Sequence, residues 1–218
     1  MLNFNIRTAN LEDVPFLVQT IIEAEKSGGD VLSYKTFFGL EEQQIENLLT
    51  EIFNEEIEDC ELSISSFLIA EKQGVRAAAL SGWLENASDI PSIILKGNLL
   101  KYHLPITCFE KASSLSYLTK SLHIDYIPNT FQIGAGYVAE GFRGQKLLGL
   151  LTKEMIQHLK EKNKTITEIY VQIFDCNIPS LRTYEKEGFK VISTKESEFS
   201  EITDYLPSSK KLLLKKEI

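Results

Sequence analysis

Residues 137–162 read YVAEGFRGQKLLGLLTKEMIQHLKEK. The segment combines a strand end, a tight turn and a long amphipathic helix. Leucine or methionine recurs at every fourth position from Leu147 to Leu159, which indicates one buried helical face. Before the turn, residues 131–138 are apolar apart from Gln132 and contain two glycines, and they predict a buried strand. A strand, a turn and a helix therefore follow one another at the centre of the chain.

The turn between this strand and helix has the composition of an anion site. It contains Gly141, Arg143 and Gly144. The first N–H groups of a helix have no partner inside the helix, and the peptide dipoles place partial positive charge there. Glycine lets the backbone approach an anion closely, and Arg143 can add a charge-assisted hydrogen bond. Since most turns of this kind are ordinary connections, the turn alone does not decide the function.

A second informative segment, residues 177–189, reads NIPSLRTYEKEGF. Asn177 is a strong helix cap, Pro179 suits a first helical turn, and Gly188 suits the position after a helix end. Asn177 and Tyr184 are seven residues apart, close to two helical turns, so they share one face. Taken alone, Asn177 is a cap and Tyr184 is a partly buried packing aromatic.

Together the two segments resemble the GNAT superfamily of N-acetyltransferases. The first resembles its acyl-CoA-binding motif: a strand ending in valine, a short acidic turn, and Arg/Gln-x-x-Gly-x-Gly/Ala opening a helix. The second resembles its Asn, small residue, Tyr and Gly-Phe pattern. Lys146 stands where the family usually has Gly, and Leu148 where it has Gly or Ala. The order of the two motifs, separated by one helix and one strand, favours the functional interpretation.

The resemblance implies an acyl-CoA-dependent N-acetyltransferase, which moves an acetyl group from acetyl-CoA to a primary amine of a small molecule or peptide by direct attack. By the same resemblance, Asn177 bonds the pantetheine or pyrophosphate arm, and Tyr184 protonates the departing thiolate. The predicted CoA-binding residues are Tyr137, Val138, Arg143, Gly144, Gln145, Lys146, Leu147, Leu148, Gly149, Asn177, Ser180 and Tyr184. The alternative is a non-catalytic acyl-CoA-binding module on a degenerate GNAT fold, which Lys146 and Leu148 favour, or a protein-interaction module whose working surface is the segment 87–130.

Direct attack requires a neutral amine, so a base or a water chain must accept a proton from an amine of pKa about 10.4. Glu85, at the end of a predicted strand, is the first candidate base, and Glu140 and Asp30 follow. A charged residue at a strand end is more often solvated surface. A bulged strand end at residues 136–138, made easier by the two glycines, could present a backbone N–H to the thioester oxyanion.

The remaining pattern predicts an α/β fold: a single domain, residues 1–218, with a mixed central sheet of about seven strands flanked by helices. Further helices are expected after residues 10–13 and over residues 45–53, the latter with an acidic outer face. The predicted strands are residues 4–7, 66–71, 75–83, 131–138, 168–174, 189–193 and 210–215. Paired lysines at 210–211 and 215–216 predict that the last strand is a solvated edge.

A helical insertion is expected at about residues 87–130, between the third and fourth strands. Its leucines predict two short helices, broken by Pro105 and Pro128. A connection of this length in a compact domain should not be structureless. The insertion either covers the acceptor site or is a decorative or dimer-forming helical pair, and the sequence favours neither.

Composition excludes several other classes of function. The formal net charge of −8 argues against general binding to nucleic acid or anionic membranes, and it fits a cationic amine, polyamine or lysine-containing peptide as acceptor. Three widely spaced cysteines and three histidines show no disulfide framework or metal-ligand spacing, so no metal is expected. The absence of a signal segment or a long apolar run predicts a cytoplasmic protein. Monomer and homodimer both stay open.

Overall fold

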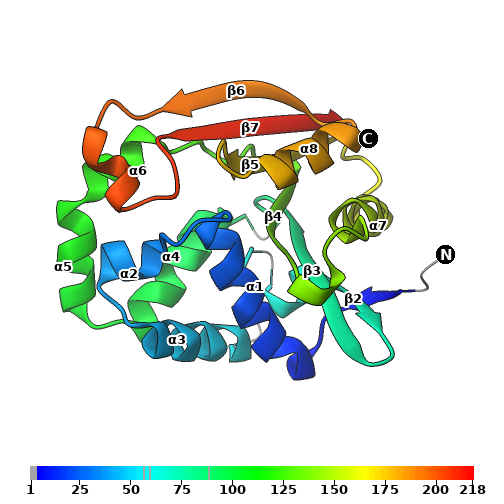
Figure 1. Ribbon diagram of the computed structural model, residues 1–218, viewed down its shortest axis with the longest axis horizontal. Coiled ribbons are helices and arrows are strands. Elements are labelled where there is room, and N and C mark those ends of the chain that lie inside the picture. Colours follow the sequence, from blue (N-terminus) through cyan, green and yellow to red (C-terminus); the bar gives the residue numbers. More distant parts are fainter. Residues whose placement is uncertain (1–3, 56, 59, 88) are drawn as a thin grey trace.

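The computed structural model describes residues 4–55, 57–58, 60–87 and 89–218. Figure 1 shows a central sheet with helices packed around it. Its strands are β1 (Asn5–Thr8), β2 (Phe67–Lys72), β3 (Val75–Leu84), β4 (Phe131–Val138), β5 (Glu168–Phe174), β6 (Lys190–Glu196) and β7 (Lys210–Glu217). Its helices are α1 (Val14–Lys26), α2 (Ser33–Phe38), α3 (Glu42–Asn54), α4 (Ser92–His103), α5 (Ile106–Ser114), α6 (Ser116–Ser121), α7 (Leu147–Lys162) and α8 (Ile178–Lys186).

Within the described residues the sheet has seven strands in the order β1-β2-β3-β4-β5-β7-β6. The β4–β5 pair is parallel, and the other neighbours are antiparallel. The predicted mixed α/β sheet is therefore confirmed. The prediction that the last strand is a solvated edge is wrong, because β7 lies between β5 and β6. Its centre, residues 212–214, is buried, and β6 is the exposed edge strand.

Two apolar layers cover the two faces of the sheet, as the alternation of side chains along β2 requires. Phe67 and Ile69 pack in one core with α1, α3 and α4, whereas Leu68 and Ala70 pack in the other with α7. Figure 1 shows α7 and α8 on the side of β3 and β4 that is opposite α1. The buried face of α7, from Leu147 to Leu159, thus holds the turn in front of it against the sheet.

The insertion between β3 and β4 differs in detail from the expectation. Within the described residues it forms three helices, α4, α5 and α6, rather than two. Leu118 and Leu122 pack with Phe37 of α2, a six-residue helix too short for the sequence pattern to reveal. The insertion therefore lies beside the segment after α1, on one side of the sheet (Figure 1).

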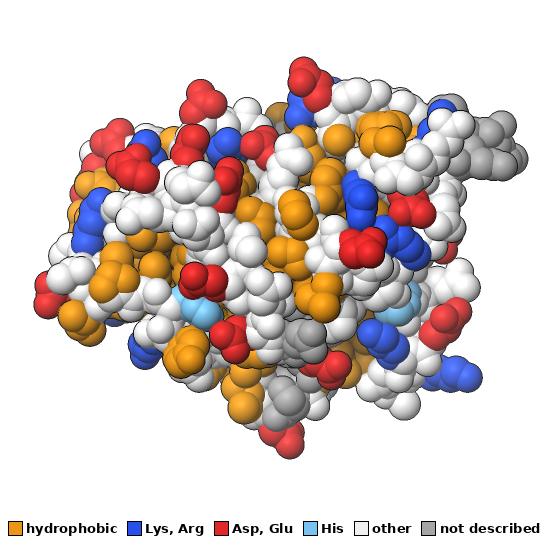
Figure 2. Space-filling model, turned by 90° about the horizontal axis from the view of Figure 1, so that it is seen from below, with side chains coloured by type: hydrophobic (Ala, Val, Ile, Leu, Met, Phe, Trp, Pro, Cys, Tyr) orange, Lys and Arg blue, Asp and Glu red, His pale blue; other side chains and the backbone are white. Residues whose placement is uncertain are grey.

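The surface carries charges of both signs. The outer face of α3 exposes Glu42 and Glu46, as its amphipathic pattern predicted. Figure 2, which views the molecule from below, shows acidic side chains spread over this face rather than gathered in one patch. None of the helices in the described residues has the length and hydrophobicity of a membrane-spanning segment.

A buried ion pair connects β1 to the start of α1. Asp13 has no exposed surface, and its carboxylate accepts hydrogen bonds from Arg7 Nη1 at 2.6 Å and Arg76 Nε at 2.9 Å. The backbone N–H of Asn10 donates a further bond at 2.9 Å. Although burial alone would raise it, these donors lower the pKa of Asp13 to about 2.

Candidate active site

The parallel strands β4 and β5 separate halfway along their length. They pair only where residues 131–133 meet residues 169–171. On its other side β4 has a bulge, because Gly134 and Ala135 together oppose Ser81 of β3. A Cβ on Gly134 would lie 2.7 Å from Trp83 Cζ3, so only glycine fits there. The predicted bulge thus exists two residues earlier than expected, and β4 diverges from β5 immediately after it.

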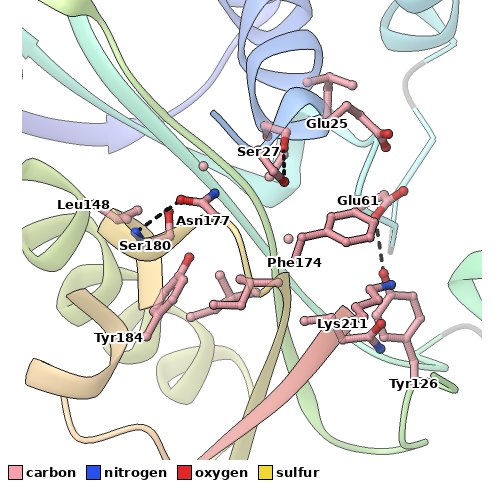
Figure 3. Close-up of a pocket in the computed structure, with 18 of the residues that line it drawn as sticks. Glu25, Ser27, Glu61, Tyr126, Leu148, Phe174, Asn177, Ser180, Tyr184 and Lys211 are labelled. Atoms are coloured by element: carbon pink, nitrogen blue, oxygen red, sulfur yellow. Dashed lines mark hydrogen bonds between the residues drawn. The ribbon is translucent and has the colours of Figure 1, made fainter. Parts of the chain in front are cut away.

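A cavity of about 170 Å³ occupies the opening between the two strands. One wall is the β4 backbone at residues 133–136, and another is β5 at residues 172–174. Figure 3 shows Asn177, Ser180, Tyr184 and Leu148 on one side of it, with Glu61, Tyr126 and Lys211 on the other. The two motifs recognised in the sequence therefore meet at a hollow in the sheet, which is where ligands of open α/β folds bind.

Asn177 and Tyr184 both line this cavity. Their seven-residue spacing predicted that they share one face of a helix. Asn177 Oδ1 accepts a hydrogen bond from Ser180 N at 3.3 Å, so the side chain caps α8 and leaves its amide NH2 available to a ligand. Tyr184 is 2% exposed, and its ring packs edge-on against Phe189. Figure 3 shows the Tyr184 hydroxyl directed toward Asn177 and Ser180 rather than into the core.

Burial raises the pKa of Tyr184 above its ordinary value. The phenol therefore keeps its proton at neutral pH. Among the described residues no side chain or backbone group hydrogen-bonds the hydroxyl. Because its pKa exceeds that of a thiol, about 8.5, the group is best suited to donate a hydrogen bond to a departing sulfur.

The turn before α7 presents unpaired backbone amides. Gly144 and Lys146 have φ angles of 78° and 60°, and α7 begins at Leu147. The first helical bond runs from Leu150 N to Lys146 O. Within the described chain, no acceptor meets the amides of residues 144–149, and Gln145 Oε1 is buried without a partner. The geometry fits a diphosphate, and Lys146 adopts the left-handed conformation that glycine adopts more readily.

The other predicted CoA-binding residues have varied positions. Leu148 lines the cavity, and its Cδ1 lies 3.2 Å from where a Cβ of Gly136 would be. Leu147 belongs to the core, and Gly149 allows close packing against Glu187 of the segment after α8. Tyr137 packs against Phe16 and accepts a hydrogen bond from Gln19 on α1. Arg143 Nε donates to Val138 O at 3.4 Å. Unlike Leu148, the other four residues do not line the cavity: Tyr137, Arg143, Leu147 and Gly149.

Glu85, the first predicted base, lies elsewhere. It is 2% exposed and is not among the residues that line the cavity. Trp83 Nε1, Ser92 N and Ser92 Oγ donate to its carboxylate at 2.9, 3.0 and 2.5 Å. The side chain thus connects the end of β3 to the start of α4. Glu140 and Asp30 do not line the cavity either. The placement gives no support to any of the three as the base.

The cavity instead holds charged residues that the sequence analysis did not single out. Glu61 and Lys96 form an ion pair, and Tyr126 Oη donates to Glu61 at 3.4 Å. Burial opposes both charges, but each partner stabilises the other, so the pKa of Glu61 is lowered and that of Lys96 is raised. Glu25 accepts a hydrogen bond from Ser33 Oγ at 2.6 Å. Burial lowers the pKa of Lys211.

One of these residues could have been found from the sequence. Glu25 lies four residues after Ile21 and eight after Leu17, so it continues the buried stripe of α1. A carboxylate at that position must face the interior or a cavity. Lys211 carried no such signal, because its strand was expected at an edge. Glu61 and Lys96 lie in a loop and in the insertion, where no motif applies.

Comparison with known proteins agrees with this geometry. The model of the acetyltransferase (GNAT) family matches residues 40–189, more than half of the chain. The chain therefore belongs to the GNAT acetyltransferase family. A search of curated proteins finds no match.

Solved structures resemble this chain in fold. An N-acetyltransferase from Staphylococcus aureus Mu50 is 14% identical, with a TM-score of 0.66 over 97% of this chain and 100% of that one. A structure described only as an acetyltransferase is 17% identical, with a TM-score of 0.65 over 98% and 99%. The Drosophila melanogaster polyamine N-acetyltransferase, which forms N-acetylagmatine, is 13% identical, with a TM-score of 0.59 over 99% and 100%. At these identities the likeness concerns the fold alone.

Proposed function

We propose that this protein transfers an acetyl group from acetyl-CoA to a primary amine of a small molecule. The observation that carries the proposal is the cavity where β4 and β5 separate, lined by Asn177, Ser180 and Tyr184 beside the open backbone of β4. The unpaired amides of residues 144–149 lie at the start of α7, which also supplies Leu148 to the cavity. A thioester held there would be near a proton donor and near backbone donors at once.

Each group then has a separate role. The free amides of the turn and Lys146 bind the diphosphate, and the Asn177 amide contacts the pantetheine arm. β4 pairs with β3 on one side as far as Val138, but its edge toward β5 has no strand partner after Ile133. A backbone N–H on that edge stabilises the oxyanion that forms as the amine nitrogen attacks the thioester carbon. The C–S bond then breaks, and the Tyr184 hydroxyl donates to the departing sulfur.

Glu25 is the proposed proton acceptor for the amine. Of the carboxylates that line the cavity, Glu61 is held in an ion pair with Lys96, whereas Glu25 has only the Ser33 hydroxyl as a partner. A carboxylate without a cationic partner can bind an ammonium group and accept its proton, directly or through water. Glu25, rather than the sequence-predicted Glu85, is therefore the proposed base.

Thiol release from acetyl-CoA in the presence of an amine panel tests the proposal. Wild type should release free thiol, and Tyr184→Phe should turn over about 10- to 100-fold more slowly with nearly unchanged affinity for CoA. Tyr102→Phe is the matched control, because Tyr102 is 79% exposed and should behave as wild type.

Thermal-shift titration with acetyl-CoA separates the alternatives. A ligand bound only by the native state raises the melting temperature. A shift without thiol release would favour a non-catalytic acyl-CoA-binding module. No shift at millimolar acetyl-CoA would contradict the proposal altogether, and equal rates for wild type and Tyr184→Phe would remove the role given to Tyr184.

A further inference from the structure

A second cavity, of about 440 Å³, adjoins the first on the side of the insertion. Residues of α2, α4 and α6 and the segment 123–126 line it. Six residues line both cavities: Glu25, Glu61, Lys96, Tyr126, Gln172 and Lys211. An acceptor that enters through the second cavity therefore passes a charged junction before it reaches Tyr184.

The charges at this junction do not all pair with each other. Glu61 and Lys96 neutralise one another. One carboxylate, Glu25, and one ammonium group, Lys211, remain. In the described part of the chain neither has an ion-pair partner within 4.0 Å, and Lys211 Nζ makes no hydrogen bond. Figure 3 shows Glu25 above Phe174 and Lys211 below it, reached from α1 and β7 respectively.

Unpaired charges in a partly buried cavity are unfavourable, because burial removes hydration that no partner replaces. Groups of this kind in a cleft are candidates for contact with a ligand. One negative and one positive group together match a ligand that carries both an ammonium and a carboxylate group. A polyamine would pair with Glu25 but would bring a further cation toward Lys211 and Lys96.

We propose that the acceptor is a small amino carboxylate, whose amine contacts Glu25 and whose carboxylate contacts Lys211. This inference rests on the proposed function, and it names the substrate class of the same site. It also revises the expectation of a purely cationic acceptor. That expectation followed from the net charge of −8 of the whole sequence, whereas recognition depends on the charges inside the cavity.

Matched acceptor pairs that differ only in the α-carboxylate test the inference. Thiol release from acetyl-CoA is measured with L-arginine against agmatine, L-ornithine against putrescine, and L-alanine against ethylamine. We expect kcat/KM to be at least about tenfold higher for the carboxylated member of at least one pair. Equal or lower values for the carboxylated member in all three pairs would overturn the proposal.

Variants of β7 locate the effect. Lys211→Met should abolish the preference by raising KM for the carboxylated member at least about tenfold, with little change for the matched amine. Lys211→Arg keeps the charge and should keep the preference. Lys210→Met is the matched control, since Lys210 pairs with Glu196 on the exposed edge strand and does not line the cavity. Equal loss for both members of the pair in a Lys211→Met protein of unchanged melting temperature would overturn the proposal.

An equilibrium measurement separates this inference from the proposed function. If no acceptor releases thiol, the same pairs are titrated calorimetrically into the protein saturated with CoA. Binding of a carboxylated member that is lost in Lys211→Met supports the site although acetyl transfer fails. Absence of binding by every carboxylated member overturns it.

Discussion

Trp83 Nε1 donates a hydrogen bond to Glu85 Oε2 at 2.9 Å, while Ser92 occupies the other carboxylate oxygen from the start of α4. Glu85 is thereby a structural connection between β3 and the insertion. Glu25 on α1 is instead a carboxylate that lines the cavity, and among the described residues it has a hydrogen bond from Ser33 and no ion-pair partner. The two residues should consequently respond differently to the same substitution.

Glu25→Gln should lower kcat by about 100-fold or more, because the amide cannot accept the proton of the amine. The affinity for acetyl-CoA should not change. Glu85→Gln should instead lower the free energy of unfolding by about 1–3 kcal/mol, since a buried carboxylate with three donors is altered. Steady-state kinetics and urea unfolding of both variants provide the measurement, and a catalytic loss in folded Glu85→Gln larger than in Glu25→Gln would contradict the assignment.

Leu148 narrows the cavity beside Gly136, where the family pattern has Gly or Ala. Leu148→Ala should therefore bind acetyl-CoA several-fold more tightly, as measured by calorimetry. Leu150→Ala, at an exposed position on the same helix, is the control and should leave affinity unchanged. Weaker binding by Leu148→Ala would mean that the leucine contacts the ligand rather than restricting it.

Lys146 occupies a left-handed conformation at the start of α7, with φ of 60°. That conformation costs a side-chain-bearing residue roughly 1 kcal/mol, so Lys146→Gly should stabilise the protein by up to about 1 kcal/mol in urea unfolding. Gly144→Ala should do the opposite. Gly144 has φ of 78° and no atom within 4 Å of its added Cβ, so the loss would reflect backbone strain alone.

Asp13 predicts an acid sensitivity of the fold. Its pKa is about 2 in the folded protein, against 3.8 for an ordinary aspartate, so it contributes stability that is present above pH 3.8 and lost as pH falls through about 2. The contribution is about 2 kcal/mol. Urea unfolding between pH 5 and pH 2 should show this loss. Asp13→Asn should be less stable at pH 6 and depend less on pH over that range, and a slope as steep as that of wild type would contradict the prediction.

The sequence predicted the elements that carry local signals. Three local features predicted helices: the four-residue spacing of apolar residues from Leu147 to Leu159, the cap at Asn177 and the glycine after α8. The structure has α7 and α8 at these positions. The relation of Asn177 to Tyr184 followed from helical spacing alone. What failed depends on pairing between distant segments. β7 lies inside the sheet because it pairs with both β5 and β6. The sequence of residues 210–217 alone does not indicate this pairing.

The charged half of the cavity escaped prediction for the same reason. Lys211 reaches the cavity because β7 pairs with β5, which places Lys211 opposite Phe174. Glu61 and Lys96 are thirty-five residues apart and meet only when α4 of the insertion packs beside the segment between α3 and β2. Lysines at strand ends normally indicate solvent, and only the strand order shows that Lys211 differs from Lys210.

The short pairing between β4 and β5 has a mechanical consequence. In the described residues, three residue pairs between β4 and β5 join strands β1–β4 to the half-sheet of β5, β7 and β6. The two halves of the sheet are therefore connected by few backbone hydrogen bonds. A ligand that contacts both Gly134 of β4 and Phe174 of β5 would connect the two halves where the strands do not pair. Ligand binding in the cavity should then slow hydrogen exchange at residues 172–174 of β5, because it reduces the motion of the two halves of the sheet relative to each other.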